Sequence, residues 1–177
     1  VALSAGYDRK TKGGLCPSPT RLEHFDYNMF LGEWFVIQEY NSPQICHRYS
    51  LSFVERGKIR VAETYGHNPT TVKSKKLKFD GDSTSKMKLH HSGGHDFIPW
   101  KVRVLATDYR SYAAVFFCRP FGVMNHQGIE IWSRTRYMNP TTLTQIRDLL
   151  TSINVDLEGV TDTIQRTCDP AYASSFG

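Results

Sequence analysis

The sequence predicts an all-β protein, an eight-stranded antiparallel up-and-down β-barrel with a C-terminal α-helix packed outside it. Three observations predict this fold. From about residue 31 to residue 134, apolar and polar side chains alternate in short runs separated by residues typical of turns. After residue 139 the apolar residues change to helical spacing. The length of 177 residues, with 40% hydrophobic residues, suits a single globular domain.

Each expected strand is a run in which alternate residues share one face. The runs cover about residues 34–40, 49–53, 59–65, 73–79, 87–91, 100–106, 113–117 and 128–132. Turn residues such as Arg56-Gly57-Lys58 and Asp80-Gly81-Asp82 lie between them. Eight antiparallel strands closed on themselves leave an interior that side chains fill or that holds one small ligand.

One helix is expected after the strands. Asn139 can cap its N-terminus, and Pro140 suits its first position. The apolar residues that follow form a single stripe, so this helix should pack against the outside of the barrel. The stripe consists of Leu143, Ile146, Leu149, Leu150 and Ile153.

Both ends of the chain are expected to lie outside the folded domain. We predict a flexible arm at residues 1–15, one domain at residues 16–170 and a tail at residues 171–177. The chain opens with Val1-Ala2-Leu3-Ser4, so we expect a secreted, extracellular protein whose signal peptide has been removed. No apolar run approaches the roughly 20 residues of a transmembrane helix.

The four cysteines at positions 16, 46, 118 and 168 include no CxxC pair, which leaves zinc ribbons and thioredoxin-type sites unsupported. Two disulfides could form in three different pairings, and the rival interpretation is four buried thiols in a cytosolic protein. The other indications of secretion favour disulfides.

The charge and the motifs exclude several function classes. The net charge of +5 permits anionic partners, but the chain lacks an aromatic stacking platform, so no nucleic acid is expected as a partner. No GxSxG elbow, phosphate loop or HExxH motif is present. We therefore expect a protein that is not an enzyme and has no catalytic residues.

Three segments resemble the conserved motifs of the lipocalin family. Gly32-Glu33-Trp34 resembles the GxW motif, Thr107-Asp108-Tyr109 resembles the TDY motif, and Arg134 resembles the third conserved segment. The resemblance covers nearly all of residues 16–170. It implies structural roles for these residues, with Arg134 stacked across Trp34 at the closed end of the barrel.

Within the family, the run Ala106-Thr107-Asp108-Tyr109 and residues 150–156 look closest to the apolipoprotein D branch, to which insect bilin-binding proteins and crustacyanin subunits are related. This resemblance implies disulfides Cys16–Cys118 and Cys46–Cys168, each worth about 3–4 kcal/mol in the chain-entropy model. No thiol would remain for prostaglandin D synthesis, the enzymatic chemistry known in the family.

The resemblance implies a secreted carrier of a small hydrophobic ligand inside the barrel. The candidates are a fatty acid or other lipid, a sterol or retinoid, or a pigment such as biliverdin or a carotenoid. No cofactor is obligatory, so a bound chromophore or lipid would be the ligand itself, and both a monomer and a homo-oligomer stay open. The residues expected to bind the ligand are Val36, Gln38, Tyr40, Tyr49, Phe53, Tyr65, Lys73, Lys75, Leu77, Met87, Leu89, His91, Trp100, Val102, Val104, Val115, Phe117, Glu130 and Trp132.

Polar residues among the inward positions have two interpretations. Lys73 and Lys75, with hydrated ammonium groups near the mouth, either meet a carboxylate or propionate of the ligand or form a solvated basic edge. Glu63 and Glu130 are further polar residues at inward positions. The Glu130 carboxylate must be paired, hydrated or protonated, so it either pairs with a lysine, receives a cationic or hydroxyl-bearing ligand, or has a hydrated structural role.

Six of the seven histidines fall in or beside the loops expected at the mouth, residues 41–48, 65–71, 90–99 and 119–127. They either bind a metal, haem or tetrapyrrole and release it with pH, or are simply exposed loop residues. No metal ligand is assigned. The alternative function is a scavenger of haem, metal or a biogenic amine through this mouth and the cavity carboxylates. The six are His47, His67, His90, His91, His95 and His126.

Overall fold

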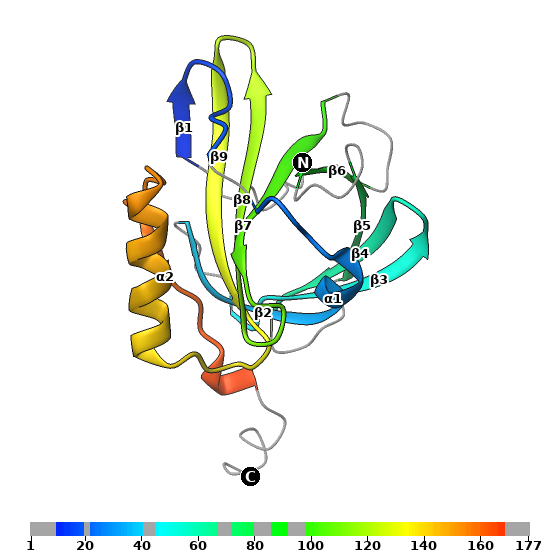
Figure 1. Ribbon diagram of the computed structural model, residues 1–177, viewed down its shortest axis with the longest axis vertical. Coiled ribbons are helices and arrows are strands. Elements are labelled where there is room, and N and C mark those ends of the chain that lie inside the picture. Colours follow the sequence, from blue (N-terminus) through cyan, green and yellow to red (C-terminus); the bar gives the residue numbers. More distant parts are fainter. Residues whose placement is uncertain are drawn as a thin grey trace.

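The computed structural model describes residues 10–19, 22–40, 45–66, 72–79, 86–91 and 98–168. A closed ring of strands forms the body of the molecule, and one long helix lies along its outside (Figure 1). The strands are β1 (Lys10–Gly13), β2 (Gly32–Tyr40), β3 (Arg48–Glu55), β4 (Lys58–Thr64), β5 (Val72–Phe79), β6 (Lys86–His91), β7 (Trp100–Thr107), β8 (Tyr112–Phe121), β9 (Met124–Ser133) and β10 (Val160–Asp162). The helices are α1 (Tyr27–Phe30), α2 (Pro140–Ser152) and the 3-10 turn η1 (Arg166–Cys168).

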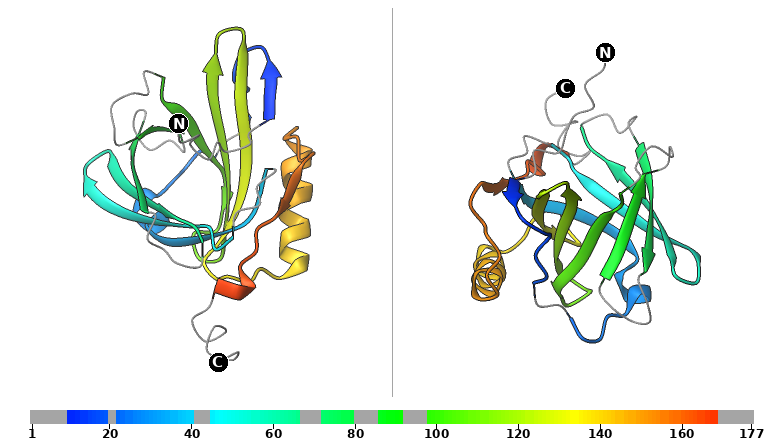
Figure 2. Two further views of the ribbon diagram at one scale, coloured as in Figure 1. Left: turned by 180° about the vertical axis from the view of Figure 1, so that it is seen from behind. Right: turned by 90° about the horizontal axis from the view of Figure 1, so that it is seen from above.

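The predicted eight-stranded barrel is confirmed. Strands β2 to β9 pair antiparallel with their neighbours in chain order, and β9 also pairs with β2, which closes the ring. Figure 2 shows the ring from above, with α2 outside it. The described part of the chain contains no helix long and apolar enough to cross a membrane.

The predicted helix and both predicted disulfides are confirmed. Helix α2 begins at Pro140, and the Asn139 side chain accepts a hydrogen bond from the Thr141 amide. Bridges join Cys16 to Cys118 and Cys46 to Cys168, so the bonds span 102 and 122 residues of sequence. They fasten the segments before and after the barrel to its wall.

Two separate apolar clusters form because the barrel wall has two apolar faces. One cluster fills the interior and includes Trp34, Val102 and Phe117. The other lies between the outer faces of β8 and β9 and helix α2, where Ile146 and Leu150 are buried. The helix therefore covers the outside of the barrel, as the single apolar stripe predicted.

The arm predicted at residues 1–15 is not flexible throughout. Residues 10–13 form β1, which pairs antiparallel with the β9 segment from Met124 to Gln127. The ammonium groups of Lys10 and Lys12 also lie 2.8 Å and 2.6 Å from Asp156 Oδ2, in the turn after α2. Residues 1–9, and the predicted tail at 171–177, lie outside the described residues.

Acid should loosen β1 from the barrel. Hydrogen bonds from Lys10 and Lys12 hold the pKa of Asp156 well below its ordinary value. A carboxylate with a lowered pKa adds stability above its ordinary pKa of about 3.9, and this stability is lost as the pH falls through the lowered pKa. We expect hydrogen-exchange protection of the β1 amides to fall below about pH 4, and to be low and less dependent on pH in Asp156→Asn. Equal acid sensitivity in both proteins would contradict this assignment.

A β-bulge at Ile37 changes which residues of β2 face inward, so the prediction for this strand is corrected. Val36 pairs with Trp132, but Gln38 pairs with Ile131, so the alternation shifts by one residue. Gln38 therefore faces outward and hydrogen-bonds Arg147 and Asp162. The predicted inward positions of Gln38 and Tyr40 are wrong, because simple alternation cannot anticipate an extra residue in one strand.

The same shift sends Glu39 into the barrel and Tyr40 out of it. Glu39 is buried and pairs across the strands with Glu130. The Tyr40 ring packs so closely on Gly159 that a Cβ there would lie 2.7 Å from a ring carbon. Gly159, which also has a φ of +81°, fits beneath this ring where no larger residue would.

Candidate ligand-binding site

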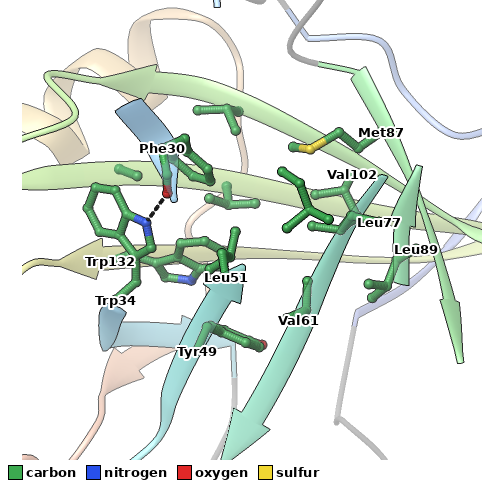
Figure 3. Packing of buried hydrophobic residues seen from close by; sticks show 14 of the residues in the cluster. Phe30, Trp34, Tyr49, Leu51, Val61, Leu77, Met87, Leu89, Val102 and Trp132 are labelled. Atoms are coloured by element: carbon green, nitrogen blue, oxygen red, sulfur yellow. Dashed lines mark hydrogen bonds between the residues drawn. The ribbon is translucent and has the colours of Figure 1, made fainter. Parts of the chain in front are cut away.

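Aromatic side chains fill the closed end of the barrel. Helix α1 places Phe30 next to the start of β2, and the Trp34 indole donates a hydrogen bond to the Phe30 carbonyl at 2.9 Å. The Phe30 ring lies 5.1 Å from that of Trp34 and 5.9 Å from that of Trp132, measured between centroids. Figure 3 shows these three rings together on one side of the interior, with Met87 and Leu89 on the other.

Arg134 closes this end from outside, as the resemblance implied. Its guanidinium carbon lies 3.6 Å from the centroid of Trp34. The same group donates hydrogen bonds of 2.9–3.0 Å to the carbonyls of Met29, Glu33 and Tyr109. A Cβ on Gly32 would lie 3.2 Å from this guanidinium, and Gly32 has a φ of +99°, so glycine suits both the space and the backbone.

Arg134→Lys should lower the free energy of unfolding by about 1–3 kcal/mol, because lysine cannot stack flat on the indole and reach three diverging carbonyls. Chemical denaturation monitored by tryptophan fluorescence measures this change. The matched control is Arg110→Lys on the exposed neighbouring turn, which should change stability by less than about 0.5 kcal/mol. Equal stability of the two variants would contradict a closing role for Arg134.

The segment Thr107-Asp108-Tyr109 is a turn that supports this closure. The Asp108 carboxylate accepts hydrogen bonds from the amides of Arg110, Ser111 and Tyr112. Burial alone would raise the pKa of Asp108, but these bonds, together with one from the Ser111 hydroxyl, lower it overall. The Tyr109 hydroxyl accepts a hydrogen bond from the Asp26 amide. The turn therefore ties β7 and β8 to the segment before α1.

Above the aromatic end, mostly apolar side chains line the barrel interior and nearly fill it. The described residues there enclose a cavity of about 20 Å³, room for about one water molecule. This volume agrees with the filled interior that the sequence left open as an alternative. The lining side chains are Phe30, Tyr49, Val61, Lys75, Leu77, Met87, Leu89, Val102, Val115, Phe117 and Trp132.

A buried polar cluster interrupts this wall on the side of β2, β3 and β4. The imidazole of His47, fully buried, lies between two carboxylates: Nδ1 is 3.1 Å from Glu39 Oε2 and Nε2 is 3.2 Å from Glu63 Oε1. The Lys75 ammonium lies 2.5 Å from the other oxygen of Glu63. Each buried carboxylate therefore has a hydrogen-bonding or ionic partner, as burial of charge requires.

Tyr49 links this cluster to a third carboxylate, Glu130. Its hydroxyl lies 3.2 Å from Glu63 Oε1 and 3.4 Å from Glu130 Oε1, and the Trp132 indole donates to Glu130 Oε2 at 2.8 Å. Among the described side chains, three carboxylates thus meet one ammonium and one imidazole. With the acids ionised, these described groups carry at least one surplus negative charge.

The structure sorts sixteen of the predicted ligand-binding residues into four groups. Ten are apolar or aromatic and belong to the interior cluster: Val36, Tyr49, Leu77, Met87, Leu89, Val102, Val104, Val115, Phe117 and Trp132. Lys75 and Glu130 are buried beside them. Tyr65 and Trp100 are half-buried at the edge, and Gln38 and Tyr40 face outward. That any of them binds a ligand stays a prediction.

The predicted environments of two residues are wrong. Phe53 follows Leu51 on the inner face, but it lies past the closed end and is 54% exposed. Lys75 does not keep a hydrated ammonium group, because that group is buried against Glu63. Lys73 and His91 lie in β5 and β6, but their side chains fall outside the described residues.

Among the histidines expected at the mouth, the structure corrects His47. His47 is buried in the polar cluster instead of exposed in a loop. His126 lies on β9, with its Nδ1 3.0 Å from the Thr11 hydroxyl of β1. His67 and His95 lie outside the described residues, and the described ones contain no group of three or more His, Cys, Asp or Glu that could hold a metal ion.

Sequence reasoning missed Glu39 and the surroundings of His47. Alternation assigned Glu39 to the outside, and only the bulge at Ile37 turns it inward. The inward position of Glu63 is the signal that could have pointed to the cluster, since a buried carboxylate needs partners.

Comparison with known proteins agrees with this geometry. The model of the lipocalin / cytosolic fatty-acid binding protein family matches residues 31–167. Apolipoprotein D of Mus musculus is 32% identical over 178 residues, covering 95% of this chain and 94% of the relative. Two solved structures share the fold at 18% identity. Lobster apocrustacyanin A1 has a TM-score of 0.73 and coverage of 94% and 97%, and insecticyanin of the tobacco hornworm Manduca sexta has 0.72 and 88% of each chain.

Proposed function

The chain belongs to the lipocalin family, and we propose that it is a secreted carrier whose barrel binds one small, neutral, hydrophobic molecule bearing a hydroxyl or similar hydrogen-bond donor. As a lipocalin related to apolipoprotein D it is a binding protein for hydrophobic ligands and not an enzyme. All four of its cysteines are in disulfides, so none is free for the prostaglandin D synthesis known in the family. The two disulfides and the apolipoprotein D relatives support secretion. Sterols, retinoid alcohols and hydroxylated carotenoids have the proposed chemistry.

The observation that carries this proposal is the combination of an apolar wall with buried carboxylates. Leu77, Met87, Leu89 and Val102 offer an apolar molecule nothing but hydrocarbon and thioether contacts. Glu130 is buried next to Trp132 and Tyr49, two residues of this wall, and its carboxylate oxygens can accept a hydrogen bond from a hydroxyl.

The same carboxylates disfavour an anionic ligand head group. In a low-dielectric interior, a fatty-acid carboxylate or a bilin propionate near Glu63 and Glu130 would face like charge. The nearby Lys75 does not offset this, because its ammonium group is already paired with Glu63. The proposal therefore prefers neutral ligands to fatty acids and biliverdin.

Binding requires the barrel to open from its present volume of about 20 Å³ to the roughly 300–1,000 Å³ typical of ligand pockets. We propose that the wall opens at β6. Strand β6 pairs with β7 only from Lys86 to Leu89, whereas β8 pairs with β9 along its whole length. The unbranched Met87 on β6 can change rotamer to make room.

The head-group preference is tested by titrating the recombinant protein with retinol and retinoic acid, which share one apolar body and differ in a hydroxyl against a carboxylate. Quenching of tryptophan fluorescence reports binding, since Trp132 lines the cavity. We expect one retinol per chain and at least tenfold weaker binding of retinoic acid at pH 7. Equal or tighter binding of retinoic acid would overturn the neutral-ligand proposal.

A second candidate is favoured by the surplus of carboxylates in the cluster, which also suits a cationic amine. Titration with histamine, followed by calorimetry, separates the two functions. Binding of histamine without binding of retinol would support the amine scavenger in place of the lipid carrier.

A further inference from the structure

A groove on the outer surface of the barrel is far larger than the interior cavity. It has a volume of about 510 Å³ and lies between β1, the outer face of β9 and the turn after α2. Figure 1 shows β1 and α2 on the same outer side of β9. Its lining residues come from positions 10–19 and 153–156 on its two sides, with Tyr40, Phe116, Asn125 and 127–129 beneath.

The walls of this groove combine apolar and polar side chains and are held in place. Leu15 lies at its edge with 86% of its surface exposed, and Ile129 and Val155 are buried in its walls. The Cys16–Cys118 bridge fastens residues 13–19, and the Asn125 side chain donates to the carbonyls of Gly14 and Leu15. The volume of the groove falls within the range of small-molecule sites.

One buried polar atom in the groove has no partner. The side chain of Gln127 is 92% buried, and among the described residues no hydrogen-bond donor reaches its Oε1. A buried amide oxygen without a donor is unfavourable. A ligand that donates to Gln127 Oε1 once this side chain turns toward the groove therefore binds more tightly than one that does not. The ionic groups at the rim, by contrast, are already matched, because Lys10 and Lys12 pair with Asp156 and Glu158.

From these observations we infer that the groove is a second ligand site, outside the barrel, for a small neutral apolar molecule with one hydrogen-bond donor directed at Gln127 Oε1. This site is independent of the barrel interior, because none of its lining residues lines the interior cavity. The protein would then carry two hydrophobic ligands at once.

The test uses two probes of the same shape, N-phenyl-1-naphthylamine, whose N–H links two aromatic groups, and 1-benzylnaphthalene, which has CH₂ in that place. Nuclear Overhauser contacts locate each probe in isotope-labelled protein. We expect contacts from the amine to the methyl groups of Ile129, Ile153 and Val155. The amine should bind about five- to tenfold more tightly than the hydrocarbon, and Gln127→Leu should bring the two affinities together.

Three results would overturn the inference. They are contacts confined to interior methyl groups such as those of Val102, equal affinities of the two probes for the wild-type protein, and an unchanged ratio in Gln127→Leu. Val61→Trp, which should block the interior, leaves the groove contacts in place if the sites are separate. Because the contacts and the affinity ratio are also measured on the wild-type protein, the test does not depend on the folding of a variant. Dimerisation that buries the groove would likewise count against a small-molecule site.

Discussion

Lys75→Met is expected to lower the free energy of unfolding by about 3–5 kcal/mol, a loss typical of breaking a buried ion pair from one side. Lys75 is 2% exposed, and its ammonium group lies 2.5 Å from Glu63 Oε2. Among the described side chains, Glu63, Glu39 and Glu130 would then have only the imidazole of His47 as a possible counter-charge. Urea denaturation followed by circular dichroism measures the change.

A double variant separates charge from packing. Glu63→Gln keeps an oxygen that can accept hydrogen bonds from His47 and Tyr49 and removes the carboxylate charge. Lys75→Met combined with Glu63→Gln should therefore recover most of the lost stability. Lys101→Met, on the exposed face of β7, should change stability by less than about 0.5 kcal/mol. A double variant no more stable than Lys75→Met alone would contradict the uncompensated charge.

Removing the Cys46–Cys168 bridge in Cys46→Ala/Cys168→Ala is expected to destabilise the protein by about 3–5 kcal/mol, because the bond spans 122 residues of sequence. The bridge also anchors the segment that completes the polar cluster. In that segment the Thr163 hydroxyl donates to Glu39, and the Gln165 amide donates to the carbonyls of Val36 and His47.

Hydrogen exchange distinguishes this bridge from the other. The amide of Thr163 donates to the Ile37 carbonyl, and we expect its protection to fall in Cys46→Ala/Cys168→Ala. Protection should persist in the matched variant Cys16→Ala/Cys118→Ala, which releases the opposite end of the chain. Equal protection at Thr163 in both variants would show that the Cys46–Cys168 bridge does not hold this segment.

The sequence predicted the barrel because strand periodicity and interior burial coincide along most of the wall. Val102, Val104, Val115 and Phe117 alternate without interruption and all face inward. The closed end was predictable from motifs, since the stacking of Arg134 on Trp34 follows from the family resemblance. The disulfide pairing had the same origin, because the positions of four cysteines allow three pairings.

The rest of the site depends on features that cannot be predicted from the periodicity of apolar residues. A bulge at Ile37 exchanges the faces of Gln38 and Glu39. The burial of Lys75 depends on a carboxylate from a neighbouring strand, and each residue alone suggests an exposed position. Strand β1 is short and polar, and backbone pairing to β9 together with ion pairs to Asp156 holds it.

The central claim is that the ligand binds inside the barrel, and retinol titration of two tryptophan variants tests it most directly. Val61 lies on the inner face of β4 and lines the cavity, whereas Arg60 beside it is exposed on the outer face. With both variants shown to be folded by circular dichroism, we predict that Arg60→Trp binds one retinol with wild-type affinity and that Val61→Trp binds at least tenfold more weakly. Wild-type affinity in Val61→Trp would contradict a binding site in the barrel interior.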